Sequence, residues 1–139
     1  MYEMAKLVLT AGYTPIVGAG KARWNNVHVA DLSQVFVLLV EAAVQGSADA
    51  ELWGAKGYTI VESGEHVWSD VARKVGRTAK ELGLLKEEPK EQSLSKEKAL
   101  EQAGFEAVSW GLNSRAKGER AGRVPVSYTH LTLPTKRIV

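Results

Sequence analysis

The sequence predicts an α/β fold, and two successions of strand and helix carry that prediction. Residues 27–29 (Val-His-Val) alternate as in a half-buried strand, and Asp31 follows where a helix N-cap would stand, ahead of a long apolar run. Residues 57–65 give a second strand pattern that ends in a glycine turn just before another helical pattern. Strands that feed helices with almost no linker are typical of layered α/β proteins.

Periodicity and glycine positions predict the elements of the amino-terminal half. Residues 2–11 form a helical pattern that Gly12 would end. An extended segment over residues 14–17 and a glycine turn over residues 18–20 follow. The helix expected over residues 31–45 is apolar almost all round, which predicts burial on most sides. Few other elements of this chain could cover it, so we expect packing partners to be missing.

The carboxyl-terminal half continues with helices and charged connections. A helix over residues 68–82, with an apolar face at helical spacing, would end at Gly83. Residues 86–92 form a charged linker that contains a proline. A serine caps a shorter helix over residues 95–102. A last helix is expected near residues 115–123, weakened by two glycines that each cost roughly 1 kcal/mol relative to alanine.

Composition excludes several classes of function. Apolar residues make up 45% and charged residues 24% of the 139, as in ordinary globular proteins. With no cysteine, there can be no disulfide, thiolate zinc site or cysteine nucleophile, and the three histidines lack the spacing of metal ligands. The net charge of +2 comes from Lys136 and Arg137 alone, which argues against nucleic-acid binding. The longest apolar run, residues 35–40, is too short to cross a membrane, so we expect a cytoplasmic protein.

Residues 126–139 differ from the rest of the chain. They contain no acidic residue and continue no earlier pattern. Val126 to Leu131 resembles one reading frame of a transposase-based sequencing adapter. We therefore expect 126–139 to be a non-native tail outside the fold. Residues 1–125 would then form one domain that ends near Pro125.

Three segments carry a resemblance to a known family. Residues 26–32 (Asn-Val-His-Val-Ala-Asp-Leu) resemble an aromatic-Val-His-Val-x-Asp-Leu segment. Residues 57–68 resemble a strand, a Gly-Glu turn and a tryptophan-led helix, and residues 113–120 resemble the start of a Ser-Lys-x-x-Arg helix. In this order the segments resemble the C-terminal part of an extended short-chain dehydrogenase/reductase of the epimerase/dehydratase group. The fungal NAD(P)-binding, NmrA-like relatives of that group are the most similar.

The resemblance implies the substrate-binding part of a Rossmann-type protein with an incomplete sheet. The family's glycine-rich loop and its catalytic Ser/Thr, Tyr and Lys precede the matched region, so we assign no catalytic and no cofactor-binding residue here. Tyr2 and Lys6 have the Tyr-x-x-x-Lys spacing, but the serine that this chemistry needs would lie upstream. NAD or NADP would bind to the intact parent, through a missing N-terminal nucleotide-binding half. Residues 58–61 would be a strand without its neighbour, so this chain alone should bind no NAD(P) and fold poorly.

Four residues are candidates for the substrate side. Trp24 stands where nucleotide-sugar epimerases place an arginine that meets the pyrophosphate. His28 is the most conspicuous titratable residue, with a hydrogen-bonded structural role as the alternative. His66 borders a pocket or lies in an exposed turn, and Arg115 holds an anionic substrate or is a solvated surface residue. The tryptophan at position 24 favours a small carbonyl or hydroxy substrate over a nucleotide sugar.

The leading hypothesis is a fragment of an NAD(P)-dependent oxidoreductase that is inactive by itself. The alternative is a non-catalytic, NAD(P)-sensing regulator of the NmrA type. An intact upstream Tyr-x-x-x-Lys pair would favour the enzyme, and its loss would favour the sensor. A third possibility, a self-sufficient interaction module, predicts a cooperative thermal transition for residues 1–125 alone.

Overall fold

The computed structural model describes residues 1–50 and 52–119. It has a mixed α/β architecture, which confirms the predicted class, while the Rossmann-type sheet stays a prediction. The chain divides into two compact units. Among the described residues, unit 1 comprises Met1–Trp24 and Glu65–Arg115, and unit 2 comprises residues 25–64, with the gap at 51, and residues 116–119.

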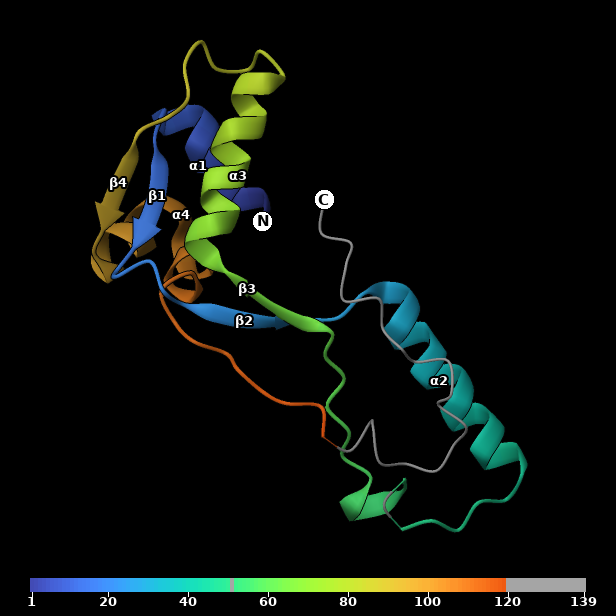
Figure 1. The fold of residues 1–139 in the computed structure, drawn as a ribbon. Helices are drawn as coiled ribbons and strands as arrows, with labels where there is room; N and C mark the ends of the chain where they lie inside the picture. The colour runs from blue at the N-terminus through green and yellow to red at the C-terminus, as the bar shows by residue number, and fades with distance from the viewer. Residues whose placement is uncertain (51, 120–139) are drawn as a thin grey trace. The chain divides into compact units, whose positions relative to one another are not determined.

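Unit 1 is a small parallel sheet covered by three helices. Strands β1 and β4 pair in parallel, from Thr14 opposite Glu91 to Val17 opposite Leu94, and their arrows point the same way in Figure 1. Helix α1 packs against α3 and α4, and all three helices contact β1. The elements of unit 1 are α1 (Tyr2–Ala11), β1 (Thr14–Val17), α3 (Trp68–Glu81), β4 (Glu91–Leu94) and α4 (Lys96–Ser109).

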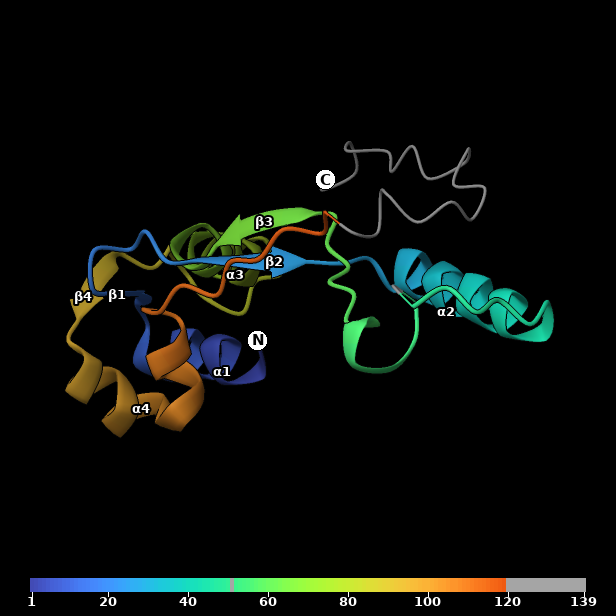
Figure 2. The same cartoon turned by 90° about the horizontal axis from the view of Figure 1, so that it is seen from below.

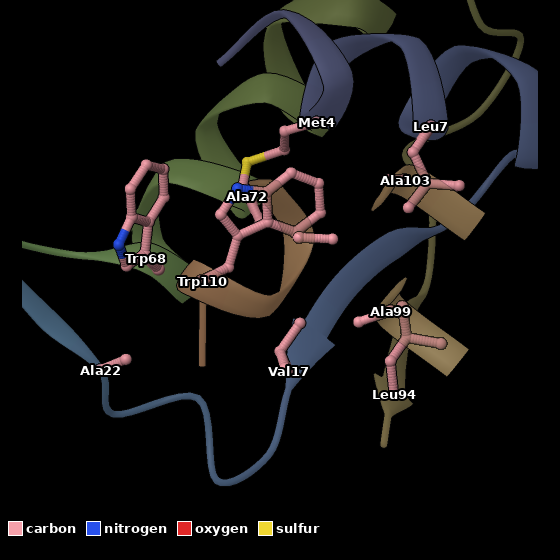
Figure 3. Packing of buried hydrophobic residues seen from close by; sticks show 11 residues of the cluster. Met4, Leu7, Val17, Ala22, Trp68, Ala72, Leu94, Ala99, Ala103 and Trp110 are labelled. Atoms are coloured by element: carbon pink, nitrogen blue, oxygen red, sulfur yellow. The ribbon is translucent and has the colours of Figure 1, made fainter. Parts of the chain in front are cut away.

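The core of unit 1 combines large side chains with alanines. Trp110 and Met4 are 2% and 0% exposed, and Figure 3 shows the Met4 side chain extending towards the Trp110 ring. Ala72, Ala99 and Ala107 are fully buried, which lets the helices approach one another closely. The remaining members of the cluster are Leu7, Val17, Ala22, Trp68, Leu94 and Ala103.

A second pair of strands, β2 (Arg23–Asn26) and β3 (Gly64–Val67), carries the residues of interest. Hydrogen bonds flank the pair at both ends. The N–H of Ser63 donates to the Asn26 carbonyl (2.7 Å), and that of Trp68 donates to the Ala22 carbonyl (3.0 Å). The strands are therefore antiparallel, as their arrowheads in Figure 2 show. On the other edge of β2, Ser114 forms a parallel bridge with Trp24.

Helix α2 (Val29–Val44) dominates unit 2, with a short 3₁₀ turn, η1 (Gly54–Lys56), after it. Few elements of the described chain cover α2, as the sequence predicts, and only its Val35 and Ala42 are buried. Its exposed side is apolar all the same, since it carries Val29 (72% exposed), Phe36 (60%), Val37 (48%), Val40 (62%) and Val44 (83%).

Two predicted strands are misplaced. Residues 27–29 form no strand, because the His28 side chain caps α2 and draws Val29 into the helix. His28 is thus the N-cap in place of Asp31, which lies in the first turn of the helix. Residues 57–62 form no strand either, and β3 begins at Gly64, where a turn was expected. Pairing with β2, rather than local composition, decides which residues become the strand.

Three further predictions are corrected in the carboxyl-terminal half. The charged linker contains β4, a polar strand in which only Leu94 is buried. Helix α4 runs past residue 102 to Ser109, with a kink at Ala103 and Gly104, whose φ is +66°. Residues 115–119 are not helical, and residues 120–139, with the predicted tail 126–139, lie outside the described residues. The helices over the described ranges include none long and apolar enough for a membrane crossing.

Candidate functional site

The structure brings three of the four predicted site residues to β2, β3 and the segment beside them in unit 1. Trp24 lies on β2, His66 on β3, and Arg115 just after the bridge residue Ser114. Side chains alternate along a strand, so Arg23 and Glu65 lie on one side of the pair, and Trp24 and His66 on the other. The predicted site therefore has a charged side and an aromatic side.

The aromatic side, which we call the aromatic cluster, consists of Trp24, His66 and Trp68. The Trp68 ring makes edge contacts with Trp24 (centroids 5.4 Å apart, 77°) and with His66 (4.8 Å, 84°). The Trp24 indole N–H donates to the Leu112 carbonyl at 2.8 Å, which fixes its ring orientation. Trp68 is 9% exposed and also belongs to the core of unit 1. The aromatic cluster is thus rigidly supported.

The charged side, which we call the Glu65 cluster, consists of Glu65, Arg23 and Arg115. Arg115 donates to both Glu65 carboxylate oxygens, at 2.6 and 3.1 Å, and the Arg23 guanidinium lies 3.9 Å away. The hydrogen bond from Arg115 lowers the pKa of Glu65 and raises the pKa of Arg115. Two guanidinium groups share one carboxylate, so the cluster keeps one net positive charge. An anion would have to compete with Glu65 for Arg115.

The imidazole of His66 is half-buried against the Trp68 ring. Burial lowers its pKa below the ordinary 6.5, which favours the neutral imidazole at neutral pH. A neutral imidazole offers one N–H donor and one acceptor nitrogen. The His66 ring stands nearly perpendicular to that of the buried Trp68 (84°).

His28 belongs to unit 2 and has a structural role. Its Nδ1 accepts a hydrogen bond from the Ala30 N–H at 3.2 Å, which satisfies one of the unpaired donors in the first turn of α2. This is the structural alternative considered for His28, and the imidazole is exposed to solvent.

The glycine turn after β1 does not fit a dinucleotide phosphate. A Cβ at Gly20 would lie 2.8 Å from Ile16 and 3.4 Å from Ser69, and the Ser69 hydroxyl donates to the Gly20 carbonyl at 2.7 Å. The chain's own side chains thus fill the space beside this glycine. The turn leads into β2, whereas phosphate loops lead into a helix N-terminus. Across residues 1–50 and 52–119, no three carboxylate or imidazole side chains gather as metal ligands would.

Sequence reasoning missed three members of the site. From the sequence, Trp68 is only the start of a helix, Glu65 is only part of a Gly-Glu turn, and Arg23 is not a site candidate. A tryptophan directly after a strand is a local signal that could have identified the aromatic cluster. No local signal could have identified the bond between Glu65 and Arg115, since 50 positions separate them.

The comparisons with known proteins give one informative match. No family model matches the chain, and no solved structure matches it. The chain is 37% identical over 129 aligned residues to the oxidase ucsJ of an Acremonium species, a fungal protein. The alignment covers 88% of this chain, and the chain spans only 37% of the length of that relative. The chain thus has an oxidoreductase as a relative, and its resemblance to the short-chain dehydrogenases stays a prediction.

Proposed function

We propose that this chain is the substrate-side part of an NAD(P)-dependent oxidoreductase of the extended short-chain dehydrogenase/reductase type. Its substrate would be a small molecule with a carbonyl or hydroxyl group. The 37% identity to a fungal oxidase across 88% of the chain carries the oxidoreductase part of the proposal. The NAD(P) dependence and the family rest on the resemblance of residues 26–32, 57–68 and 113–120. Because the chain spans about a third of that relative, the activity of the whole protein needs residues that this chain does not supply.

The two sides of the predicted site support a small, partly apolar substrate. The aromatic cluster offers the half-buried rings of Trp24 and His66, which suit a carbonyl or hydroxyl group next to apolar atoms. The Glu65 cluster offers little to a diphosphate, because Glu65 already occupies the guanidinium of Arg115 and would repel a second anion. A nucleotide sugar is therefore disfavoured.

The dinucleotide would bind outside this chain. The glycine turn at Gly20 is packed against Ile16 and Ser69, so it leaves no phosphate cradle. When bound to the remainder of the parent protein, NAD(P) would supply the hydride transfer. The residues of this chain would bind and orient the substrate beside it.

Two features of unit 2 support the proposal that an N-terminal half is missing. The exposed side of α2 is apolar from Val29 to Val44, and such surfaces mark sites of contact with other polypeptide. Residues 57–62 have the composition of a strand but pair in no ladder with any other residue that the structure describes. An exposed apolar helix face and a strand-like segment outside the described ladders are what we expect of a chain that packs against the rest of a larger α/β protein.

A chimera tests the proposal. In it, this chain replaces the aligned 37% of the fungal oxidase, and NADPH and NADH binding and substrate turnover are measured. We expect the chimera to turn substrate over faster than the oxidase truncated at the same positions. In the chimera, His66→Ala should lower this turnover, and Lys80→Ala should leave it nearly unchanged. The 139-residue chain alone should show no saturable binding in the same titration. Saturable NAD(P) binding to this chain alone would contradict the proposal that the cofactor binds to the remainder of the parent protein. Cofactor binding to the chimera without turnover would favour the NmrA-type sensor.

A further inference from the structure

The chain after α4 lies beside β2 as a strap, residues 112–115, which runs in orange alongside that strand in Figure 2. The strap begins next to Gly111, where an added Cβ would lie 2.7 Å from the Val17 side chain. It ends at Arg115, which donates two hydrogen bonds to Glu65. Both ends are therefore fixed, and the groups that the strap presents to β2 lie in defined positions.

One hydrogen bond between the strap and β2 departs from a regular ladder. In a parallel ladder, a residue bonds through its N–H and its carbonyl to the two residues that flank its partner on the next strand. The Ser114 N–H donates to the Arg23 carbonyl at 3.0 Å, which makes Asn113 the partner of Arg23. The Arg23 N–H should then donate to the Leu112 carbonyl. It donates instead to the side-chain Oδ1 of Asn113, at 2.9 Å.

The Leu112 carbonyl that Arg23 leaves accepts a hydrogen bond from Trp24. The indole N–H of Trp24 donates to it at 2.8 Å. This bond orients the half-buried Trp24 ring, which meets the Trp68 ring at a centroid distance of 5.4 Å. Without the Asn113 side chain, the Arg23 N–H would compete with the indole for the Leu112 carbonyl.

We propose that Asn113 is a positioning residue, which orients Trp24 in the aromatic cluster by keeping the Leu112 carbonyl available to the indole. This role needs only an acceptor oxygen at the end of a short side chain, because Oδ1 receives the Arg23 N–H. Aspartate also carries such an oxygen, and alanine does not. The inference rests on the proposed function, since the orientation of Trp24 matters to a substrate only if the aromatic cluster receives one.

The test measures how fast the Trp24 indole N–H exchanges with water, by NMR on the full ¹⁵N-labelled 139-residue chain. Asn113→Ala should speed this exchange about two- to tenfold, as expected from the loss of one neutral hydrogen bond. Asn113→Asp should restore the original rate. The Ser114 amide should stay protected in Asn113→Ala, because its bond to the Arg23 carbonyl does not use the Asn113 side chain. Faster exchange of both protons would mean that the strap had detached, which would overturn the proposal.

Two controls show that the effect is confined to Trp24. Gln102→Ala removes a side-chain hydrogen bond elsewhere in unit 1, so the Trp24 exchange rate should stay unchanged. The Trp53 indole N–H, which donates to the Ser47 carbonyl at 2.9 Å in unit 2, should exchange equally fast in every variant. An unchanged Trp24 rate in Asn113→Ala, or no recovery in Asn113→Asp, would overturn the proposal.

The chimera with the fungal oxidase separates this inference from the proposed function. In it, Asn113→Ala should raise the KM for the substrate of the oxidase about two- to tenfold, with a smaller change in kcat, because Trp24 orients the substrate and transfers no proton or hydride. Asn113→Asp should restore the KM. An unchanged KM in an active chimera would overturn the role of Asn113 in the site. A chimera without turnover would contradict the proposed function, whereas the exchange rates would still decide whether Asn113 orients Trp24.

Discussion

The guanidinium of Arg115 donates two hydrogen bonds, from Nε and Nη2, to the two carboxylate oxygens of Glu65, at 2.6 and 3.1 Å. This fork holds the segment after α4 against β3. It joins residues 50 positions apart in the chain. Since Arg23 also lies beside the same carboxylate, Glu65 is the centre of the charged side of the site.

Replacing Glu65 should change how the free energy of unfolding depends on pH. The hydrogen bond from Arg115 holds the pKa of Glu65 below its ordinary 4.5. Its stabilisation is therefore fully present above pH 4.5 and is lost as the pH falls through the folded-state pKa. We expect Glu65→Gln to flatten the loss of unfolding free energy as the pH falls below 4.5, measured by urea denaturation. Glu101→Gln, at an exposed position of α4, is the matched control, and equal slopes for both variants would contradict the prediction.

His66 should affect the stability of the fold in a separate, less acidic pH range. Burial lowers the pKa of His66 from 6.5, so the unfolded chain takes up this proton more readily than the folded one. Stability is then lost as the pH falls from about 6.5 through the folded-state pKa of His66. His66→Gln should remove this part of the pH dependence, as followed by thermal unfolding at several pH values. An unchanged dependence in the variant would exclude His66 as its source.

Trp110 should be the most costly single truncation in unit 1. It is 2% exposed and lies in the centre of the core cluster. Trp110→Ala should lower the free energy of unfolding by about 3–5 kcal/mol, because it leaves a large cavity. Phe105→Ala, in the same helix but 80% exposed, should change it by less than about 0.5 kcal/mol. Similar losses in chemical denaturation for the two variants would contradict the observed core.

His28 should be replaceable by a better helix cap. His28→Ala removes the acceptor for the Ala30 N–H and should cost about 1 kcal/mol, with fraying at the start of α2. His28→Asp should restore or exceed the original stability, because an aspartate accepts the same bond and favours the positive end of the helix dipole. Circular dichroism during denaturation measures both changes. A loss on His28→Asp as large as on His28→Ala would show that the imidazole has another role.

The ends of α1 and α3 and the start of α4 were predictable because their signals are local. Gly12 and Gly83 both have positive φ beyond the ends of α1 and α3, and Ser95 caps α4 through the Lys98 N–H at 3.3 Å. The strands were less predictable, since pairing partners far along the chain decide them. Most of β4 is polar, and it exists because β1 lies beside it.

The site likewise contains residues that could be predicted from the sequence and residues that could not. Trp24, His66 and Arg115 stood out as residue types at junctions between predicted elements, and the structure places them on or beside β2 and β3. Glu65 and Arg23 could not be assigned from the sequence, because their roles arise only when β2, β3 and the segment after α4 meet.

Trp68 links the aromatic cluster to the core of unit 1, because its ring contacts Trp24 and His66 and also belongs to the core cluster. A compound that settles on these rings in the native protein, and not in the unfolded chain, would raise the melting temperature with its concentration. At a hundredfold excess over its dissociation constant, the gain is about 2.7 kcal/mol. Thermal-shift screening of a library of carbonyl compounds and alcohols would thus detect ligands of this surface without any catalytic assay.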